Sequence, residues 1–411
     1  MSPDRPREPR EFRYWHNRKR LWARALRRSM QLALGFDPQP DDGLARRVAD
    51  MYYDADPLAE AFVDEVYFGD GAERGRQLLD RAIAAQSVAE LDDAPDSLLE
   101  LFADLDRDPP WVDHQLVERG ARVFRGYGTA VFHFAGAITL AGYAESSVAK
   151  PLVLTGGYTG DSTRQRFLET AAFWIAVSEP GGMRRGAPGW ASAMRVRIMH
   201  VFVRRRLLAH PEWRVEDWGV PISQGDALLT LMGGSFAPGL ALRAMGFRTS
   251  DDDILALLHF WRYVGHVMGV RPSWYPTTME DGYRLSYLTA VKAAHRSGAD
   301  GRLLCQSFIE AFDAAGGDIR SRLAAAIHRG YTRFFTPPWI YSAMKMPRVG
   351  LWALHPLAQF PVIFAAETAR RHSRTADAVL DRAARWQRDS WFQHHMGERK
   401  AEYHPPTALT R

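Results

Sequence analysis

The chain has 411 residues, 46% of them hydrophobic, which is enough for a large buried core. The first 30 residues hold ten Lys and Arg against three Asp and Glu, so the body of the chain is close to neutral and offers no basic stripe for nucleic acid. The one cysteine, Cys305, excludes a disulfide within the chain, Fe–S clusters, cysteine-based zinc sites and covalent haem attachment through a CxxCH motif.

Residues 12–34 are the first predicted element, a basic amphipathic helix. Trp15, Trp22, Leu26 and Ala33 follow one helical stripe, and six Lys and Arg occupy much of the remaining surface. Such a helix can lie on an anionic membrane, or it can pack over the domain and keep its Arg side chains in water. We therefore treat residues 1–40 as an N-terminal extension and leave both interpretations open.

The rest of the chain is predicted to be helical. Long segments with a period of 3.6 residues dominate, alternating strand patterns are scarce, and Pro and Gly cluster between the periodic segments. No long linker divides the chain. We expect an all-α fold with a single large domain over residues 41–400 and a C-terminal tail over residues 401–411.

The predicted helix over residues 164–177 carries polar groups on an otherwise apolar face. Arg166, Thr170, Phe173 and Val177 share this face, and Glu169 lies beside it. Because Arg166 precedes Glu169 by one turn, we expect the two side chains to form an ion pair.

The predicted helix over residues 190–208 has His200 at the centre of an apolar seam, with Arg197 and Arg204 one turn away on either side. A neutral imidazole in such a seam can ligate a haem iron, and nearby Arg side chains can pair with the haem propionates. The alternative is a core histidine between two surface arginines, and spacing alone favours it.

The predicted helix over residues 253–270 places His259, Arg262 and His266 on one face. Two histidines at this spacing suggest a non-haem metal hydrolase. The sequence lacks the dense set of His and carboxylate residues that such a site requires, so a core role is the commoner outcome.

Five motifs resemble a known family, in order and over residues 100–290. Residues 166–173 resemble its Arg-Leu-x-x-Thr-x-x-Phe helix, and residues 195–204 are similar to its Val-Arg-x-x-His-x-x-x-Arg motif. Residues 218–224 resemble its Trp-Gly-x-Pro-Ile-x-Gln turn, residues 261–265 its Trp-Arg-Tyr-x-Gly segment, and residues 108–113 the entry to its first core helix. This is the family of haem-dependent oxygenases that includes the latex-clearing rubber oxygenases and the mpaB enzymes.

The resemblance implies a globin-like helical core with additional helices and a b-type haem. His200 would be the axial iron ligand, Arg166 and Thr170 would lie near the haem, and Arg197 and Arg204 would support the ligand helix and the propionates. The implied reaction is the cleavage of a C=C bond by O₂ in an apolar, isoprenoid-like small molecule or polymer.

One residue departs from the pattern. Rubber-cleaving members resemble Arg-x-x-Lys-Thr where this chain has Glu169 before Thr170, and their lysine can close the distal position of the iron. We therefore expect an open distal site, with His133 or His266 as the first residues to test if a second ligand exists. Glu145 is the nearest acidic residue on a preceding helix and is the candidate catalytic base, or otherwise a helix cap.

The alternative function is a haem-binding or haem-free interaction protein on the same helical scaffold. The sequence shows no export signal, and its longest apolar stretches, such as residues 350–366, contain His and Pro and fall short of a clean membrane span. The expected location is cytoplasmic. The alternative is a cytoplasmic protein with peripheral membrane contact through residues 12–34.

Overall fold

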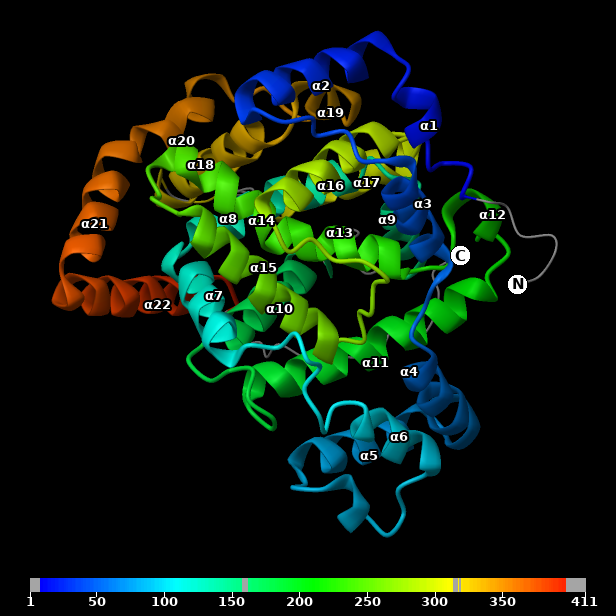
Figure 1. Cartoon of the computed structure of the whole chain (residues 1–411). Helices are drawn as coiled ribbons and strands as arrows, with labels where there is room; N and C mark the ends of the chain where they lie inside the picture. The colour runs from blue at the N-terminus through cyan, green and yellow to red at the C-terminus, as the bar shows by residue number, and fades with distance from the viewer. Residues whose placement is uncertain (1–7, 157–161, 313–316, 318, 397–411) are drawn as a thin grey trace.

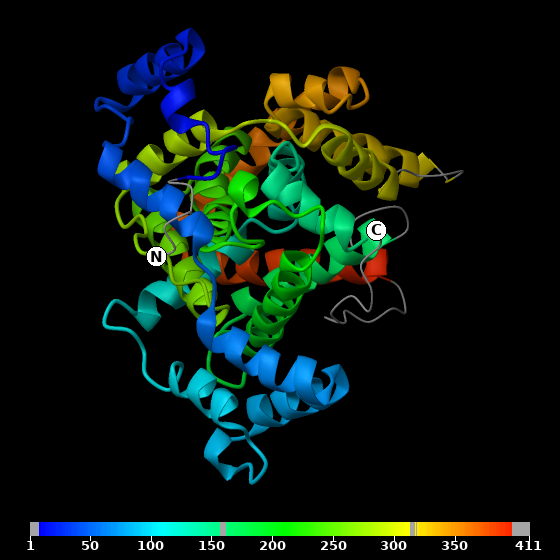
Figure 2. The same cartoon turned by 90° about the vertical axis from the view of Figure 1, so that its right-hand side faces the viewer.

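The computed structural model describes residues 8–156, 162–312, 317 and 319–396. Over these residues the secondary structure consists of helices without a strand, and they form a single large domain (Figure 1). The all-α class predicted from the sequence is confirmed. Figure 2 shows the same arrangement from the side.

The centre of the domain is a close pair of helices, α7 (His114–Gly126) and α15 (Asp251–Val267). Gly120 permits the close approach, because a Cβ there would overlap the carbonyl oxygen of Ala256 and lie 2.5 Å from Phe260 Cβ. The start of α15 is fixed by a capping box, in which Ser250 and Asp253 satisfy each other's backbone N–H groups. These features hold the long, buried α15 firmly at the core.

Two further long helices, α10 (Ser162–Ser178) and α11 (Pro188–Leu208), run side by side against this pair. Their bounds contain the predicted segments 164–177 and 190–208, whereas α15 ends three residues before the predicted residue 270. Pro188 starts α11 at the position where a missing N–H costs nothing. The buried residues of α11 lie on more than one face, which matches a helix surrounded by neighbours.

The remaining central helices follow in chain order around this core. They are α8 (Ala130–Gly142), α9 (Ser146–Leu154), α12 (Val215–Trp218), α13 (Gln224–Gly234), α14 (Phe236–Ala241), η4 (Leu242–Met245), α16 (Met279–Lys292) and α17 (Gly298–Ala311). By length and composition, the helical stretch Gln224–Met245 could cross a membrane, and half of it is buried within the domain.

The N-terminal residues pack into the domain. The predicted single helix is two helices, α1 (Tyr14–Asn17) and α2 (Leu21–Leu34), and Phe12, Tyr14 and Ala23 belong to the main buried cluster. The predicted stripe is wrong, because Trp15 and Leu26 contact the core while Trp22 is 49% exposed and Ala33 is also exposed. The described part of residues 1–40 is therefore integrated with the domain rather than set apart from it.

A smaller group of helices lies below α11 in Figure 1. After α3 (Asp42–Asp50) and η1 (Met51–Tyr53), the group comprises α4 (Pro57–Phe62), the π-helix η2 (Val63–Asp70), α5 (Ala72–Ala84), η3 (Val88–Glu90) and α6 (Asp96–Ala103). The start of α4 contacts α11, so this group reaches the middle of the domain through residues 55–60.

The C-terminal helices wrap the outside of the domain. They are α18 (Ile319–Phe335), α19 (Pro338–Ala343), η5 (Gly350–Leu354), α20 (His355–Ala358), α21 (Phe360–His372) and α22 (Arg374–Met396). Arg388 fixes α22 to the end of α10, since its buried guanidinium donates to Ser178 Oγ at 2.8 Å and to Glu179 Oε1 at 2.9 Å.

Candidate functional site

A small cavity lies beside the middle of α11. Four segments build it: the α11 face, the residue before α4, the turn before α13 and the loop after α15. Its lining consists of Asp56, Arg197, His200, Val201, Arg204, Ile222, Gln224, Ala227, Met268, Gly269 and Val270. All three α11 residues singled out in the sequence for cofactor binding are among them.

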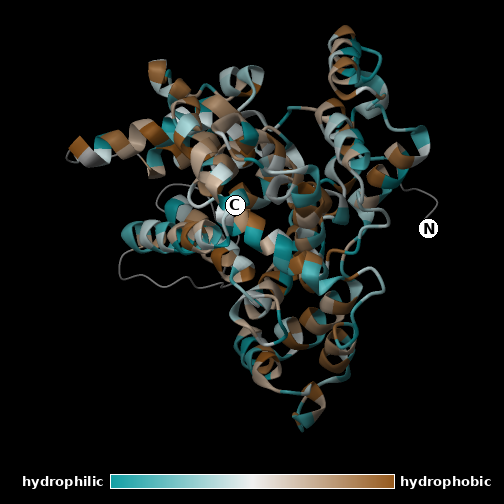
Figure 3. Cartoon of the chain, turned by 60° about the vertical axis from the view of Figure 1, so that its left-hand side comes forward, coloured by the Kyte–Doolittle hydropathy of each residue, from teal (hydrophilic) through white to brown (hydrophobic). Residues whose placement is uncertain are grey.

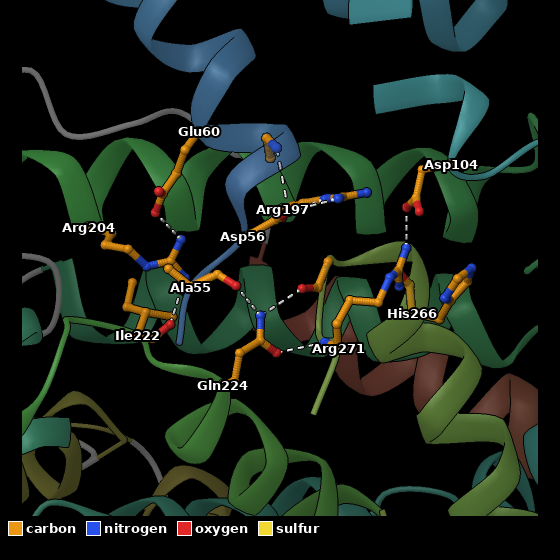
Figure 4. A network of polar contacts seen from close by, with 12 residues as sticks. Ala55, Asp56, Glu60, Asp104, Arg197, Arg204, Ile222, Gln224, His266 and Arg271 are labelled. Carbon is orange, nitrogen blue, oxygen red and sulfur yellow. Dashed lines mark hydrogen bonds and ion pairs between the residues drawn. The ribbon is translucent and has the colours of Figure 1, made fainter. Parts of the chain in front are cut away.

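Gln224 ties three of these segments together (Figure 4). Its side-chain amide donates to Ala55 O at 2.7 Å and to Gly269 O at 3.0 Å, and its Oε1 accepts from the backbone N–H of Arg271 at 2.6 Å. The preceding Ser223 caps α13 by accepting from Asp226 N, which fixes the position of Gln224 at the helix start. This network connects three of the cavity walls to one another.

Arg197 and Asp56 form a buried ion pair at the cavity wall. Arg197 Nε donates to Asp56 Oδ2 at 2.7 Å and Nη2 donates to Oδ1 at 2.8 Å, the two-point geometry that a guanidinium and a carboxylate favour. Gly269 lies directly over the pair with a φ of +75°, and a Cβ there would overlap Asp56 Oδ2. The third nitrogen, Arg197 Nη1, is buried without a hydrogen-bond partner among the described residues.

Arg204 is held mainly by backbone oxygens. It donates to Pro221 O at 2.9 Å and Ile222 O at 2.7 Å, and Nη1 reaches Glu60 Oε1 at 3.2 Å. Burial lowers the pKa of Arg204 from its ordinary value. Both arginines therefore face protein partners rather than solvent, and they tie α11 to residues 56, 60 and 221–222.

His200 faces the cavity between these two arginines. Burial in the surrounding protein, together with the charge of Arg204, lowers the pKa of His200 to about 4. The imidazole is therefore neutral at pH 7, and it has no hydrogen bond to another described residue. His200 is partly accessible, and it lines the cavity. A neutral, unpartnered imidazole is the form that binds metals.

The donors at this cavity suit a haem group. His200 could supply a nitrogen ligand, and the unpartnered Nη1 of Arg197 could supply a buried donor for a carboxylate. The cavity encloses little free space, so a macrocycle would require the lining segments to move apart. Residues 157–161, which precede α10, lie outside the described residues.

Arg166, Glu169 and Thr170 lie on α10 and do not line this cavity. Arg166 Nη1 and Glu169 Oε2 are 3.0 Å apart, which confirms the predicted ion pair. Gln165 donates to the same carboxylate at 3.1 Å, and Thr170 Oγ1 donates to Arg166 O at 3.0 Å. Glu169 is buried rather than solvent-facing.

Glu145 stands at the N-cap position of α9, away from the cavity. Its carboxylate accepts from the backbone N–H groups of Ala294 at 3.2 Å and His295 at 3.1 Å, and it lies 3.3 Å from His295 Nδ1. The Glu145 side chain makes no capping bond to α9, and its carboxylate instead holds the backbone that follows α16.

The other candidate histidines do not line this cavity, and His259 and His266 both contact Trp111. His259 Nε2 accepts from the backbone N–H of Asp113 at 2.9 Å, and His266 packs edge-on against Trp111. His133 stacks on Tyr331 with ring centroids 4.6 Å apart. Within the described ranges, no group of three or more His, Cys, Asp or Glu side chains is placed to hold a metal ion.

Asp56, Gln224 and Gly269 line the cavity, although the sequence pattern did not indicate them as site residues. Gln224 and Gly269 lay inside or beside recognised motifs, but nothing in the motifs showed which side chains they contact. Asp56 precedes Pro57, a pairing typical of a helix start, and this signal predicts a cap rather than an ion pair with residue 197.

Comparisons with known proteins point to one family. The family model for the catalytic domain of ER-bound oxygenase mpaB/B′ and rubber oxygenase matches residues 121–371. A rubber oxygenase from Streptomyces sp. (strain K30) is 26% identical over 191 residues, 45% of this chain and 46% of that protein, so the chain spans about half the length of this relative. The structure of latex clearing protein in the closed state superposes with a TM-score of 0.63 at 18% identity, covering 82% of this chain and 91% of the other, and shows a shared fold.

Proposed function

Because this chain belongs to the family of ER-bound oxygenase mpaB/B′ and rubber oxygenase catalytic domains, we propose that it is a haem-b-dependent oxygenase. The proposed reaction uses O₂ to cleave or oxidise a C=C bond of an apolar, isoprenoid-like substrate. The family predicted from the five motifs is confirmed, since the matched residues make up more than half of the chain. The observation that best supports the haem is His200, a neutral and unpartnered imidazole in a cavity beside a buried, partly unpartnered arginine.

Four residues at the cavity have a proposed task. His200 would bind the iron, and Arg197 Nη1 would donate to a propionate while Asp56 holds the rest of its guanidinium. Arg204 would keep the ligand helix fixed to residues 221–222. The haem, when bound, would supply the site at which O₂ is activated.

The α10 residues would face the substrate side. Arg166 and Thr170 do not line the cavity as it stands, and they would border the space for O₂ and substrate only once the cavity has opened for the haem. Rubber-cleaving members carry a sequence like Arg-x-x-Lys-Thr at this position, whereas this chain has Glu169 in place of the lysine. Because no lysine is present there to bind the iron, the proposed distal site is open. This difference favours a smaller isoprenoid over polyisoprene as the substrate.

The first test is the absorbance spectrum of the purified chain after reconstitution with haemin. We expect a Soret band at one haem per chain, and we expect His200→Ala to lose it while far-ultraviolet circular dichroism stays helical. His114→Ala removes an exposed histidine and should keep the haem. Full haem content with an unchanged spectrum in His200→Ala would overturn the ligand assignment. No Soret band in the wild type would favour the alternative, a haem-free interaction protein on this scaffold.

The second test addresses the reaction. Oxygen uptake by the reconstituted protein would be measured with a panel of terpenoids, and carbonyl products would be identified by mass spectrometry. We expect uptake with at least one unsaturated terpenoid and none with its saturated analogue. Equal uptake with both would exclude chemistry at a C=C bond.

A further inference from the structure

Residues 349–366 form an uncharged stretch on the outside of the domain. They contain no Asp, Glu, Lys or Arg, and they span η5, α20 and the first turns of α21. We refer to this stretch as the apolar edge. Figure 1 places α20 and α21 on the outer left of the molecule.

The apolar edge exposes large hydrophobic side chains. Leu351 is 84% exposed and Val362 is 75% exposed. The others with substantial exposure are Trp352, Leu354, Leu357, Phe360 and Phe364. Figure 3, in which this side of the molecule comes forward, colours the ribbon by hydropathy. Single exposed hydrophobic residues are ordinary, but seven in one continuous segment mark an interaction surface.

The apolar edge is fixed to the domain and is not a loose tail. Gly246 lies so close to it that a Cβ there would be 2.6 Å from Phe360 O, and Gly330 fits against the carbonyl of Trp352 in the same way. Tyr331 donates to Gln359 Oε1 at 3.0 Å. The exposed side chains therefore stand outward from an anchored backbone.

Cations border the apolar edge on both sides. Lys345 and Arg348 precede it, Arg371 and Arg374 follow it, and all four are exposed. The only acidic residue between positions 345 and 374 is Glu367, which pairs with Arg370 at 3.4 Å. Hydrophobic side chains flanked by Lys and Arg are the composition that binds the interface of an anionic membrane.

We infer that the apolar edge docks this protein on an anionic lipid surface. The exposed hydrophobic side chains enter the boundary between headgroups and acyl chains, and the four bordering cations contact the headgroups. A second copy of the chain fits less well, because a two-fold contact across this edge would bring the cations of one copy towards those of the other. The inference is independent of the haem, and it places the membrane contact at residues 349–366 rather than at residues 12–34.

The test is co-sedimentation of the full chain with large unilamellar vesicles. We expect strong binding to vesicles of phosphatidylcholine and phosphatidylserine and weak binding to phosphatidylcholine alone. Leu351→Glu with Val362→Glu should reduce binding at least about tenfold, since it places two charges in the apolar interface. Both side chains are largely exposed, so circular dichroism and the unfolding midpoint should stay unchanged.

The control is Leu32→Glu on α2, where the leucine is 87% exposed but lies outside the apolar edge. It should bind vesicles like the wild type. Arg348→Gln with Arg374→Gln should weaken binding to anionic vesicles about tenfold and leave the weak binding to phosphatidylcholine unchanged.

Three results would overturn the inference. The first is no sedimentation of the wild type with anionic vesicles. The second is equal loss of binding in Leu32→Glu, which would assign the contact to the N-terminal helices. The third is a combination of two findings. Light scattering would show a wild-type dimer that becomes a monomer in Leu351→Glu with Val362→Glu, and vesicle binding would be unchanged in that variant. This result would assign the apolar edge to self-association.

Discussion

Arg197 and Asp56 join the middle of α11 to the start of α4 through a buried ion pair, 141 residues apart in the sequence. Their side chains are 1% and 6% exposed. A buried charge that loses its partner cannot be rescued by water, and breaking such a pair typically costs about 3–5 kcal/mol. The pair therefore couples the lower group of helices in Figure 1 to the wall of the candidate haem site.

We expect Asp56→Asn to lower the free energy of unfolding by about 3–5 kcal/mol, because Asn keeps the helix cap at α4 but leaves Arg197 as an uncompensated buried charge. Urea unfolding followed by circular dichroism measures the change. The control is Asp64→Asn, which breaks the pair with Arg205 whose side chains are 40% and 43% exposed, and should cost less than about 1 kcal/mol. Equal effects of the two variants would contradict this role for the buried pair.

A second prediction concerns Gly269, which covers the same ion pair. Gly269→Ala should destabilise the protein by about 3 kcal/mol or more, because the new Cβ adds an overlap with Asp56 to the strain of a positive φ. The control is Gly35→Ala, which has a similar φ of +78° but no atom within 4 Å of the new Cβ. That variant should cost only about 1 kcal/mol. If the midpoint of thermal unfolding falls equally in both variants, the contact with Asp56 does not contribute to the loss of stability.

A third prediction concerns pH. His133 and His328 lie with ring centroids 5.9 Å apart between α8 and α18, and burial lowers their pKa values to about 4 and about 3. In the unfolded chain both titrate near pH 6.5, so below that pH the unfolded state binds more protons than the native state. Their contribution to stability is therefore complete above about pH 6.5 and is lost as the pH falls towards 4.

His328→Phe should flatten this pH dependence. Within the described part of the chain, His328 Nε2 is buried without a partner, so a phenyl ring beside Phe308 and Phe312 replaces it without breaking a hydrogen bond. Between about pH 7 and about pH 5 we expect the variant to lose about 2 kcal/mol less stability than the wild type. Urea unfolding at both pH values measures this, with the exposed His372→Phe as the control. An unchanged pH slope in His328→Phe would show that the pKa of His328 is not lowered in the native state.

The sequence predicted the helices and the local contacts of the site. The 3.6-residue period identified α10 and α11, and a spacing of three residues identified the Arg166–Glu169 pair, because both depend on neighbours along one helix. The motifs placed His200 with Arg197 and Arg204, and the cavity contains all three.

The long-range partners could not be predicted in this way. Arg197 binds Asp56 and Arg204 binds residues 221–222, and these contacts depend on how distant segments pack. The prediction of one helical stripe over residues 12–34 was wrong for a related reason. A turn at residues 18–20 separates α1 from α2, and Trp22 therefore lies away from the face that packs against the domain.

The last prediction tests whether the distal side of a bound haem is open. Glu169 is buried on α10, and its carboxylate pairs with Arg166 and accepts from Gln165, so it supplies no nitrogen ligand. With haem bound, we expect a five-coordinate or water-bound ferric protein that takes up imidazole or cyanide readily. Glu169→Lys places an amine at the position where rubber-cleaving members carry the lysine of a sequence like Arg-x-x-Lys-Thr. This variant should give a six-coordinate spectrum and weaker imidazole binding. Glu169→Gln is the matched control, because it removes the charge without adding an amine, and its spectrum should stay like that of the wild type. A low-spin wild-type spectrum with two nitrogen ligands would contradict an open site, and His133→Ala and His266→Ala would then show which histidine binds.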